Sequence, residues 1–546
     1  MTGNHPHQPL IPPIVAGRRI ARTERCRARP GNLRSGMEGG MTTPRHVLLI
    51  NPTITRHRNA RFPYAVLNLS AALDESGRYT STILDGNVDR DFVTTAVRKL
   101  EGGQIDAVGI SVMGGPQLRS AIPVSQAIRA RFPSIPIIWG GHFPTICAEP
   151  SLNSPYVDYA IRAQGEQTLI ELLDVLFGVT SGSVETIAGL SWRRDGQIIH
   201  NPNRAFSTAG LGRSLPYERL SDPRHYFGRT FLGRRTAGYQ AALGCRFRCT
   251  FCGVAAMFRG KTALPPAQRL EHELRLLHTQ FGMDSIQFYD HNFFDREEDT
   301  APLLEVLAGL QLPWWCFARA DALLNLSERS WALVRKSRLR MAYIGAESPS
   351  DWLLHDVRKG TRTDQTLEAV EICRRNGVIP ELSFMLAPPQ DPEGETERTF
   401  EFIRHIKRLH PQTEIMLYIY APLPPAPGSK NPQVERAVAS LRDSDGQPLV
   451  FPSTADEWAE QKWLTYWCHT DTPWLTTQLR ARIRDFTTVL GCRFPTITDV
   501  RSPPWGKAAL QALASWRYRY QRYGRPWELD LSRKFIKLWD PRVSGL

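Results

Sequence analysis

The sequence predicts an α/β protein made of two successive α/β domains and a helical C-terminal region. Strand-like and helix-like patterns alternate with short Gly-containing loops from residue 45 to 180, and the alternation resumes over residues 236–440. Residues 441–546 instead show helical patterns rich in Trp and Arg. Strands that alternate with helices form parallel sheets whose ligand sites lie beyond the carboxyl ends of the strands. We therefore expect a doubly wound, flavodoxin-like domain, a connector over 181–235, a partial (β/α)6 barrel and a helical domain.

Composition limits the class of protein before any motif is considered. The chain has 546 residues and a formal net charge of +14. Residues 1–44 are predicted to be a disordered basic tail, since the first 41 hold seven arginines and two glutamates without a core-forming pattern. Met37 and Met41 stand just before the first predicted strand, so the tail is also open to interpretation as an upstream start that the working protein does not need. The remaining basic residues form no dense run, so nucleic-acid binding is not expected.

The cysteine content and hydropathy point to a cytoplasmic protein. The sequence has nine cysteines, and those outside one cluster are widely scattered, unlike a secreted disulfide framework. Neither a run of 18 apolar residues nor the apolar core of a secretion signal occurs. We expect a reducing, cytoplasmic environment.

The first domain is predicted from six segments in order. Residues 46–52 form an apolar run ended by Asn and Pro, 65–77 have helical spacing with a Gly stop, and 81–87 form a second strand. Residues 106–115 and 135–141 are further strands that end in glycines, and 158–178 read as a strand followed by a helix. Several residues fall at these strand ends, where a ligand is expected: Ser111, Met113, Gly140, Gly141, Gly165 and Glu166.

The connector contains a predicted hairpin. Residues 189–201 read GLSWRRDGQIIHN, and Asp195-Gly196 supplies the positive φ angles of a tight turn. The following Pro- and Arg-rich residues have no regular pattern, so we expect an irregular connector there.

Three cysteines fall within eight positions, in LGCRFRCTFCGV, as Cys245, Cys249 and Cys252. A structural zinc site typically needs four ligands, and no fourth Cys or close Cys/His pair follows. Three thiolates instead suit an iron–sulfur cluster that keeps one iron open for an outside ligand. The second domain is thus expected to carry a redox cluster in a loop that follows a strand.

The barrel is predicted from the segments that follow this triplet. Residues 267–282 form an amphipathic helix with a Gly stop, and 285–290 form a strand. Strand patterns recur over 314–321, 340–348, 381–389 and 414–430, with helical patterns between them. Polar residues close several of these strands: Asp290, His291, Asn292 and Glu347. Chemistry in such barrels takes place at the carboxyl ends of the strands.

The triplet and the strand-end residues resemble those of radical S-adenosylmethionine (SAM) enzymes. The resemblance implies that Cys245, Cys249 and Cys252 hold a [4Fe-4S] cluster whose free iron binds SAM, and that Phe251 shields it. It further implies that Asp290 and Asn292 contact the amino group of SAM. Glu347 is then expected to bind the ribose. Ala387 stands where the family usually has Gly, which weakens the expected backbone contact with adenine.

The first domain resembles a cobalamin-binding domain in the spacing of Ser111-x-Met113 and Gly140-Gly141. The resemblance implies that these residues, with Gly165 and Glu166, line the buried nucleotide tail. Met113 stands where the pattern prefers Leu, and the Asp-x-His-x-x-Gly sequence that supplies a histidine to cobalt is missing. We therefore expect that no histidine holds the lower face of cobalamin.

Together the two resemblances point to a cobalamin-dependent radical SAM enzyme. The implied activity is methylation of an unactivated carbon in a large apolar metabolite. Oxidative cyclisation or rearrangement of a tetrapyrrole-type substrate is the alternative. A non-catalytic cobalamin or iron–sulfur sensor and a structural zinc protein are alternatives of other classes. A tRNA methylthiotransferase would need three further cysteines near its N-terminus, but residues 45–180 contain only Cys147.

The C-terminal region offers two interpretations. Eight of the fourteen tryptophans follow residue 457, and they either pack a helical cap onto the barrel or line a cavity for a large apolar substrate. The accompanying arginines would then meet a carboxylate, a phosphate or a membrane surface. Arg246 and Arg248, beside the cluster cysteines, are expected to attract an acidic flavodoxin or ferredoxin as electron donor.

Overall fold

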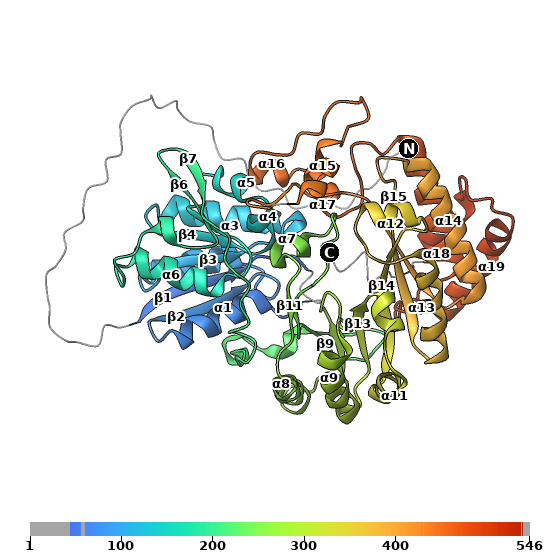
Figure 1. Ribbon diagram of the computed structural model, residues 1–546, viewed down its shortest axis with the longest axis horizontal. Helices are drawn as coiled ribbons and strands as arrows, with labels where there is room; N and C mark the ends of the chain where they lie inside the picture. The colour runs from blue at the N-terminus through green and yellow to red at the C-terminus, as the bar shows by residue number, and fades with distance from the viewer. Residues whose placement is uncertain (1–43, 56–59, 430, 537, 539–546) are drawn as a thin grey trace, which may run out of the picture. The chain divides into compact units, whose positions relative to one another are not determined.

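The computed structural model describes residues 44–55, 60–429, 431–536 and 538, and Figure 1 shows their arrangement. The predicted basic tail, including Met37 and Met41, lies outside the described residues.

The first domain is built on a seven-stranded sheet with the order β2-β1-β3-β4-β5-β6-β7. Its strands are β1 (Arg45–Asn51), β2 (Tyr79–Asp85), β3 (Ala107–Ser111), β4 (Ile137–Gly140), β5 (Tyr159–Ile161), β6 (Leu190–Arg194) and β7 (Gln197–His200). Strands β1 to β5 are parallel in the order 2-1-3-4-5. This is the flavodoxin-like order, in which ligands bind where the order reverses, between β1 and β3. The predicted doubly wound domain is confirmed.

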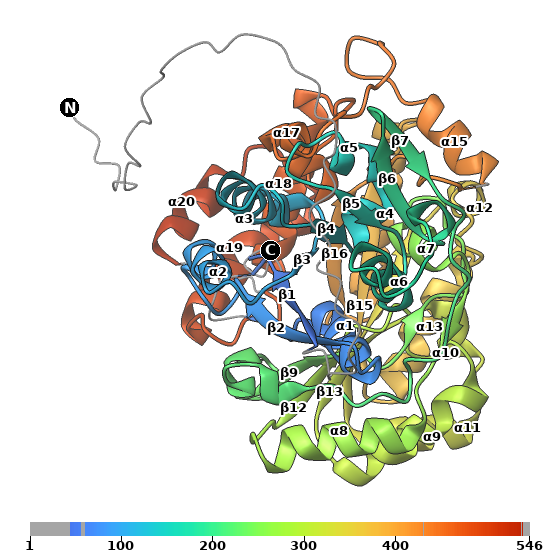
Figure 2. The same ribbon diagram turned by 90° about the vertical axis from the view of Figure 1, so that its left-hand side faces the viewer.

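Helices cover both faces of this sheet, because alternate strand residues point to opposite sides. They are α1 (Tyr64–Glu75), α2 (Phe92–Glu101), α3 (Leu118–Arg131), α4 (His142–Ile146), α5 (Ala148–Leu152) and α6 (Glu166–Leu176). Val47 and Leu49 pack with α1 and α6, whereas Leu48 and Ile50 pack with α2 and α3. Figure 2 shows the sheet with these helices from the side.

The predicted hairpin forms, but it belongs to the first sheet. Asp195 (φ +50°) and Gly196 (φ +81°) make the turn, and β6 pairs antiparallel with β5. The sheet thus extends into the segment that was expected to be only a connector. Between the hairpin and the second domain the chain forms short helical turns, such as Tyr217–Arg219 and Pro223–Tyr226.

The second domain is an open parallel sheet with the order β16-β15-β14-β13-β12-β9-β8. Its strands are β8 (Phe227–Gly228), β9 (Thr236–Tyr239), β12 (Ser285–Phe288), β13 (Trp314–Ala318), β14 (Leu339–Glu347), β15 (Ile379–Leu386) and β16 (Glu414–Ile419). Its helices are α8 (Ala267–Thr279), α9 (Glu297–Leu310), α10 (Ala320–Leu324), α11 (Glu328–Ser337), α12 (Asp351–Asp356), α13 (Thr363–Arg375) and α14 (Pro392–Leu409). All pairs from β9 to β16 are parallel, so six strands form the predicted partial barrel. The short β8 pairs antiparallel at its edge.

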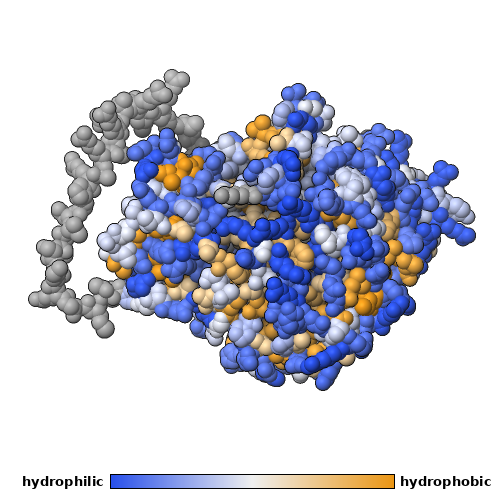
Figure 3. All heavy atoms as spheres, viewed as in Figure 1, coloured by the Kyte–Doolittle hydropathy of each residue, from blue (hydrophilic) through white to orange (hydrophobic). Residues whose placement is uncertain are grey.

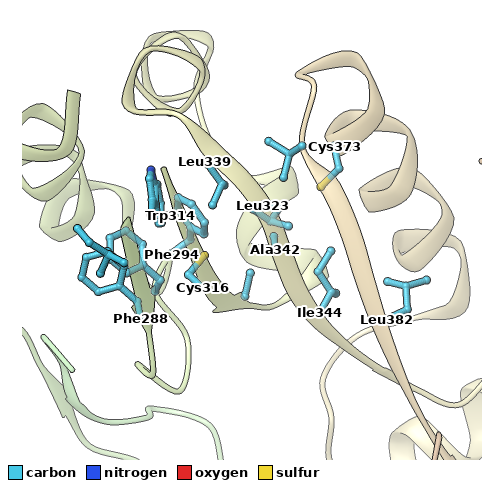
Figure 4. Close-up of a cluster of buried hydrophobic side chains, with 14 of the residues drawn as sticks. Phe288, Phe294, Trp314, Cys316, Leu323, Leu339, Ala342, Ile344, Cys373 and Leu382 are labelled. Atoms are coloured by element: carbon cyan, nitrogen blue, oxygen red, sulfur yellow. The ribbon is translucent and has the colours of Figure 1, made fainter. Parts of the chain in front are cut away.

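The core of this domain lies between the strands and the outer helices. Phe288, Trp314, Cys316 and Ile344 project from neighbouring strands toward that layer, where Leu323 of α10 meets them (Figure 4). All five side chains are fully buried. The alternation of apolar residues in the strands therefore fixes which side chains remain for the barrel interior.

The C-terminal region is helical, as predicted. It contains α15 (Pro432–Ala439), α16 (Ala455–Trp458), α17 (Gln461–Trp467), α18 (Thr477–Arg493), α19 (Pro504–Arg519) and α20 (Trp527–Phe535). Helix α18 packs on the barrel through Phe486, whose ring stacks on Phe400 of α14 at 3.7 Å. The segment around α16 and α17 packs instead on the helices and loops of the first domain.

The C-terminal tryptophans that the structure describes divide into two groups, and Trp539 lies outside the described residues. Trp458, Trp463 and Trp474 are buried, and Trp467 is half-buried beside them. Trp505, Trp516 and Trp527 are 47–70% exposed. The packing interpretation therefore holds for the first group, although much of this packing is on the first domain and not on the barrel. The surface seen in Figure 3 is largely hydrophilic with small hydrophobic groups. Among the described residues, no helix is both long and apolar enough to cross a membrane.

Candidate functional site

The three cysteines lie in one loop at the carboxyl end of the first barrel strand. The loop begins after β10 (Leu243–Gly244), which pairs with β11 (Thr262–Ala263), and it ends where α7 (Gly253–Phe258) begins. Cys249 is buried, and Cys245 and Cys252 are half-buried. The amide of Cys252 donates to the carbonyl of Cys249 at 3.2 Å, which turns the loop back toward its start.

The Cys249 thiol lies close enough to Cys245 and Cys252 to contribute to the raised pKa of both. Burial raises the pKa of Cys252 to about 11, and the neighbouring Cys249 adds to this. The amides of Val254 and Ala255 point at the Cys252 sulfur and oppose the rise. Burial likewise raises the pKa of Cys245, against one hydrogen bond from the backbone. A buried thiolate needs a positive partner, which iron supplies when these residues hold a cluster.

The donor set fits a cluster better than a single ion. Within the described part of the chain, no group of three or more His, Cys, Asp or Glu side chains converges on one metal position. A tetrahedral zinc ion needs such convergence, whereas the thiolates of an iron–sulfur cube bind separate irons. The alternative of a closed zinc site therefore gains no support from the geometry.

Asp290 follows β12 and is fully buried. Both of its oxygens accept from the backbone of the segment before the cysteine loop, one from Ala241 at 3.2 Å and the other from Ala242. Burial raises the pKa of Asp290 to about 7, although these amides oppose the rise. Asp290 thus fixes the start of the cysteine loop, and its contact with SAM stays a prediction.

Two buried oxygen atoms beside the loop lack a hydrogen-bond partner among the described residues. They are Oδ1 of Asn292 and Oδ2 of Asp295. Nδ2 of Asn292 donates to Oδ1 of Asp295 at 3.1 Å, and Arg246 donates to the same oxygen at 2.8 Å. Two unpartnered acceptors suit a ligand ammonium, as in the amino group of SAM. The sequence argument named Asn292 but missed Asp295, which lies three residues further on.

Glu347 ends β14 in a strained conformation. Its φ is +64°, a left-handed value that is rare for residues other than glycine, and its side chain is buried. Oε1 accepts from Nζ of Lys359 at 2.7 Å, also in a buried position. The strain and the ion pair hold this carboxylate at the carboxyl end of the strand, where the ribose contact was predicted.

Ala387 adopts φ +54° directly after β15, although it is not glycine. Its carbonyl accepts from the indole of Trp474 at 2.9 Å, and its amide donates to Thr396. The chain therefore keeps the glycine-like backbone at this position, with C-terminal support from Trp474.

The predicted cobalamin residues of β3 and β4 lie together at the switch-point side of the first sheet. Ser111 pairs with Gly140, and a Cβ on Gly141 (φ +99°) would lie 3.0 Å from the carbonyl of Val112. Met113, at the tip of the same loop, is 55% exposed. Gly165 and Glu166 begin α6 after the next strand, and Glu166 lines a separate cavity of about 940 Å³ that also borders α1.

His142 was not singled out from the sequence, yet it joins the two domains. It follows the Gly pair, and Nδ1 donates to the carbonyl of Met113 at 3.0 Å. Its other ring edge faces Gly253, where a Cβ would overlap Nε2 and lie 2.8 Å from Cε1. Helices α4 and α7 are in contact there, as Figures 1 and 2 show. The glycine pair of the first domain and the cysteine loop of the second therefore lie side by side.

Trp467 supports this junction from the C-terminal region. Its ring lies edge-to-face with His142 at 5.5 Å. A Cβ on Gly114 would overlap the same ring, and one on Gly115 would lie 2.9 Å from it. Only glycine at these two positions lets the indole approach the loop after β3 so closely.

Another cavity, of about 290 Å³, occupies the barrel interior. Most of its aromatic lining comes from the strands or directly follows them (Tyr289, Trp315, Phe317, Tyr343 and Tyr418), and Tyr226 and Phe231 lie outside them. None of the described C-terminal tryptophans lines it, so a substrate cavity lined by those tryptophans stays a prediction.

Two protein families match the chain. The model of the B12 binding domain matches residues 58–173, and that of the radical SAM superfamily matches residues 239–403. The chain carries a B12-binding domain and a radical SAM domain. The second match includes all three loop cysteines, and the first includes the glycine pair. The expected cofactors, cobalamin, a [4Fe-4S] cluster and SAM, agree with both matches.

Curated relatives fall into two types. An uncharacterized methyltransferase of Pyrococcus horikoshii is 23% identical over 333 residues, which cover 59% of this chain and 69% of the relative. An anaerobic magnesium-protoporphyrin IX monomethyl ester cyclase of Synechocystis is 23% identical over 300 residues, covering 54% and 57%. The chain thus spans less than two thirds of the cyclase.

Solved structures share the fold. The radical SAM methyltransferase TsrM of Kitasatospora setae, with tryptophan substrate and a SAM analogue bound, has a TM-score of 0.61 at 18% identity, over 90% of this chain and 98% of that one. OxsB with aqua-cobalamin has a TM-score of 0.59 at 15% identity, over 90% and 75%. The protein therefore joins a B12-binding domain to a radical SAM domain and belongs to the cobalamin-dependent radical SAM enzymes.

Proposed function

We propose that this enzyme methylates an unactivated carbon of a large, largely apolar metabolite, using two molecules of SAM. The observation that carries the proposal is the contact between His142, next to the predicted cobalamin loop, and Gly253, next to the last cluster cysteine. A radical formed at the cluster and a methyl group carried by cobalamin must reach the same substrate atom, which requires the two loops to be adjacent.

The cofactors, when bound, would supply the radical and the methyl group. The chain's own residues would position them. Asp290 holds the backbone before Cys245, and the unpartnered oxygens of Asn292 and Asp295 would accept the SAM ammonium. Glu347 would contact the ribose while Lys359 neutralises part of its charge. Asp290, Asn292, Asp295 and Glu347 are buried, and a dry environment around them would help to keep water from quenching a carbon radical.

The substrate proposal rests on one feature of the barrel and on the relatives. Several aromatic rings line the interior cavity of the barrel, and they favour a flat or apolar body. The methyltransferase relatives favour methylation, whereas the magnesium-protoporphyrin cyclases favour cyclisation of a tetrapyrrole, which is the second candidate. Cytoplasmic reducing conditions and an acidic flavodoxin or ferredoxin are part of the proposal, since an outside donor must supply the electrons.

Product analysis tests the reaction type. Full-length protein is reconstituted anaerobically with iron, sulfide and cobalamin, reduced, and given SAM with candidate apolar metabolites. A methyltransferase yields both 5′-deoxyadenosine and S-adenosylhomocysteine, together with a product heavier by one methylene. With a substrate that is consumed, deoxyadenosine without homocysteine would reject methylation and support the cyclase candidate. Neither product would reject both and favour a sensor.

A further inference from the structure

A further open cavity, of about 600 Å³, lies directly beside the loop that carries the three cysteines. Cys249 and Cys252 line one side, α4 and the residue after β5 line another, and residues 423–429, 431–434 and 436 after β16 complete it. It is distinct from the aromatic cavity of the barrel interior, with which it shares no lining residue.

The charge of this cavity is entirely positive among the described residues. Five arginines line it: Arg162, Arg248, Arg259, Arg358 and Arg436. No Asp or Glu is among the described residues of the lining, and none of the five arginines forms an ion pair within the described part of the chain. By contrast, Arg246, two residues before Arg248, is paired with Asp295 at 2.8 Å. Unpaired cations that share one cavity repel each other, so the cavity attracts an anion.

Arg162 makes the strongest case, because it is only 1% exposed. Nη1 donates to Oδ1 of Asn203 at 2.6 Å and to the carbonyl of Pro427 at 3.3 Å. Nη2 donates to the carbonyls of Leu190 and Asn201. Nε is buried and has no partner among the described residues. Its hydrogen-bond partners are thus all neutral oxygens, which leaves a buried positive charge without a counter-charge among the described residues.

Arg162 keeps this charge at neutral pH. Burial, and secondly the nearby Arg259, lower the pKa of Arg162 to about 10. The guanidinium therefore stays protonated at pH 7. Arg259 follows α7 in a left-handed conformation (φ +50°) and is half-buried. The arginines at the rim of the cavity, Arg248, Arg358 and Arg436, are exposed. The arginines thus extend from the buried interior to the surface.

We propose that this cavity binds a carboxylate or phosphate group of the substrate and so holds the substrate beside the cluster loop. Guanidinium groups bind both anions through paired N–H donors. Part of the remaining lining is apolar, with Ile146, Phe251, Leu423 and four prolines, so it accommodates the adjoining carbon skeleton. A volume of about 600 Å³ suits a small organic molecule and not a protein surface. The inference rests on the proposed function and adds a charged end to the predicted apolar substrate.

The test uses the full-length holoenzyme with cluster, cobalamin and SAM bound, so that the cofactors already fill their own anion sites. Inorganic phosphate and n-octyl phosphate are titrated by calorimetry at constant ionic strength. We expect saturable binding of one octyl phosphate per chain, tighter than inorganic phosphate because the octyl group meets the apolar lining. Arg259→Gln should weaken binding at least tenfold, and Arg436→Gln should weaken it less because it lies at the rim.

Arg193→Gln is the matched control, since Arg193 is exposed, lies on β6 outside the cavity and carries the same charge. Its affinity should equal that of the wild type. Absence of saturable binding, or equal losses in Arg193→Gln and Arg259→Gln, would overturn the inference. Phosphate binding that disappears once cobalamin or SAM is added would assign the arginines to a cofactor and overturn it as well. Failure of the proposed function is seen separately, as a protein that takes up no iron or cobalt.

A docking role for an acidic electron carrier is the remaining outcome. If Arg259→Gln and Arg436→Gln slow cluster reduction by flavodoxin but leave octyl phosphate binding unchanged, the arginines serve a protein partner and the substrate inference is wrong. If they weaken octyl phosphate binding and leave the reduction rate unchanged, the inference is supported.

Discussion

Replacing Gly253 by alanine tests the junction between the two cofactor loops. The added Cβ would overlap Nε2 of His142 and lie 2.8 Å from Cε1 and 3.2 Å from Cδ2, against about 3.5–4 Å for ordinary carbon contacts. The ring cannot simply swing away, because Nδ1 is hydrogen-bonded to the carbonyl of Met113 and the ring of Trp467 lies edge-to-face with the imidazole. Overpacking of this kind costs about 1–3 kcal/mol. The usual gain of about 0.5–1 kcal/mol from replacing a helical glycine offsets part of it.

We expect a net loss of about 1–2 kcal/mol, measured as a lower urea midpoint of the metal-free full-length chain, together with reduced iron uptake. His142→Ala removes the obstacle, so Gly253→Ala should cost nothing, or stabilise slightly, in that background. Gly309→Ala is the matched control, because Gly309 lies in helix α9 with open space around its Cβ position. An unchanged loss in the His142→Ala background would refute the contact as the cause.

Three further variants test other parts of the site. Asp290→Asn should remove a pH dependence of the free energy of unfolding. The pKa of Asp290 rises from 3.8 to about 7 on folding, so its carboxyl stabilises the native state below pH 4, and this stabilisation is lost as the pH rises to 7. At about 1.4 kcal/mol per pKa unit, the loss of stability is roughly 4 kcal/mol. The urea midpoint of the wild type should therefore fall relative to that of the variant between pH 4 and 7. Parallel curves of urea midpoint against pH would contradict this prediction. Lys359→Met leaves Glu347 buried without its partner and should lower the free energy of unfolding by about 3–5 kcal/mol. The Lys359→Met/Glu347→Gln double variant should recover this stability. No recovery would show that the broken ion pair is not the cause. Trp467→Ala should cost roughly 3 kcal/mol and reduce cobalamin retention with little change in iron content, because the indole packs on the loops of the first domain; an equal loss of iron would reject this assignment.

The parallel α/β architecture of both domains was predictable from the alternation of strand and helix patterns, because parallel strands with helical crossovers allow few arrangements. Periodicity could not show that the hairpin at Asp195-Gly196 pairs with β5, since pairing partners are chosen by tertiary packing. The cysteine loop was predictable because its three ligands lie within eight residues. The junction of His142 and Gly253 was not, because the two residues lie in different domains and neither carries a recognisable motif.

Ion pairs and hydrogen bonds between residues that are distant in the sequence are likewise not predictable from the sequence. Glu347 was predicted from its place at a strand end, but its left-handed backbone and its pairing with Lys359 are consequences of the folded barrel. Arg162 looked like an ordinary strand-end arginine in the sequence. Only burial without any carboxylate nearby distinguishes it from the many arginines that are paired on the surface.

The most direct test of the central claim is electron paramagnetic resonance of the anaerobically reconstituted, reduced protein with and without SAM. The account predicts about four irons per chain, a reduced-cluster signal, and a change in that signal when SAM binds the open iron. Cys249→Ser should abolish the signal, while Cys147→Ser, which changes a buried cysteine outside the loop, should retain it. Bound zinc in place of iron, or a cluster signal that SAM leaves unchanged, would contradict the account.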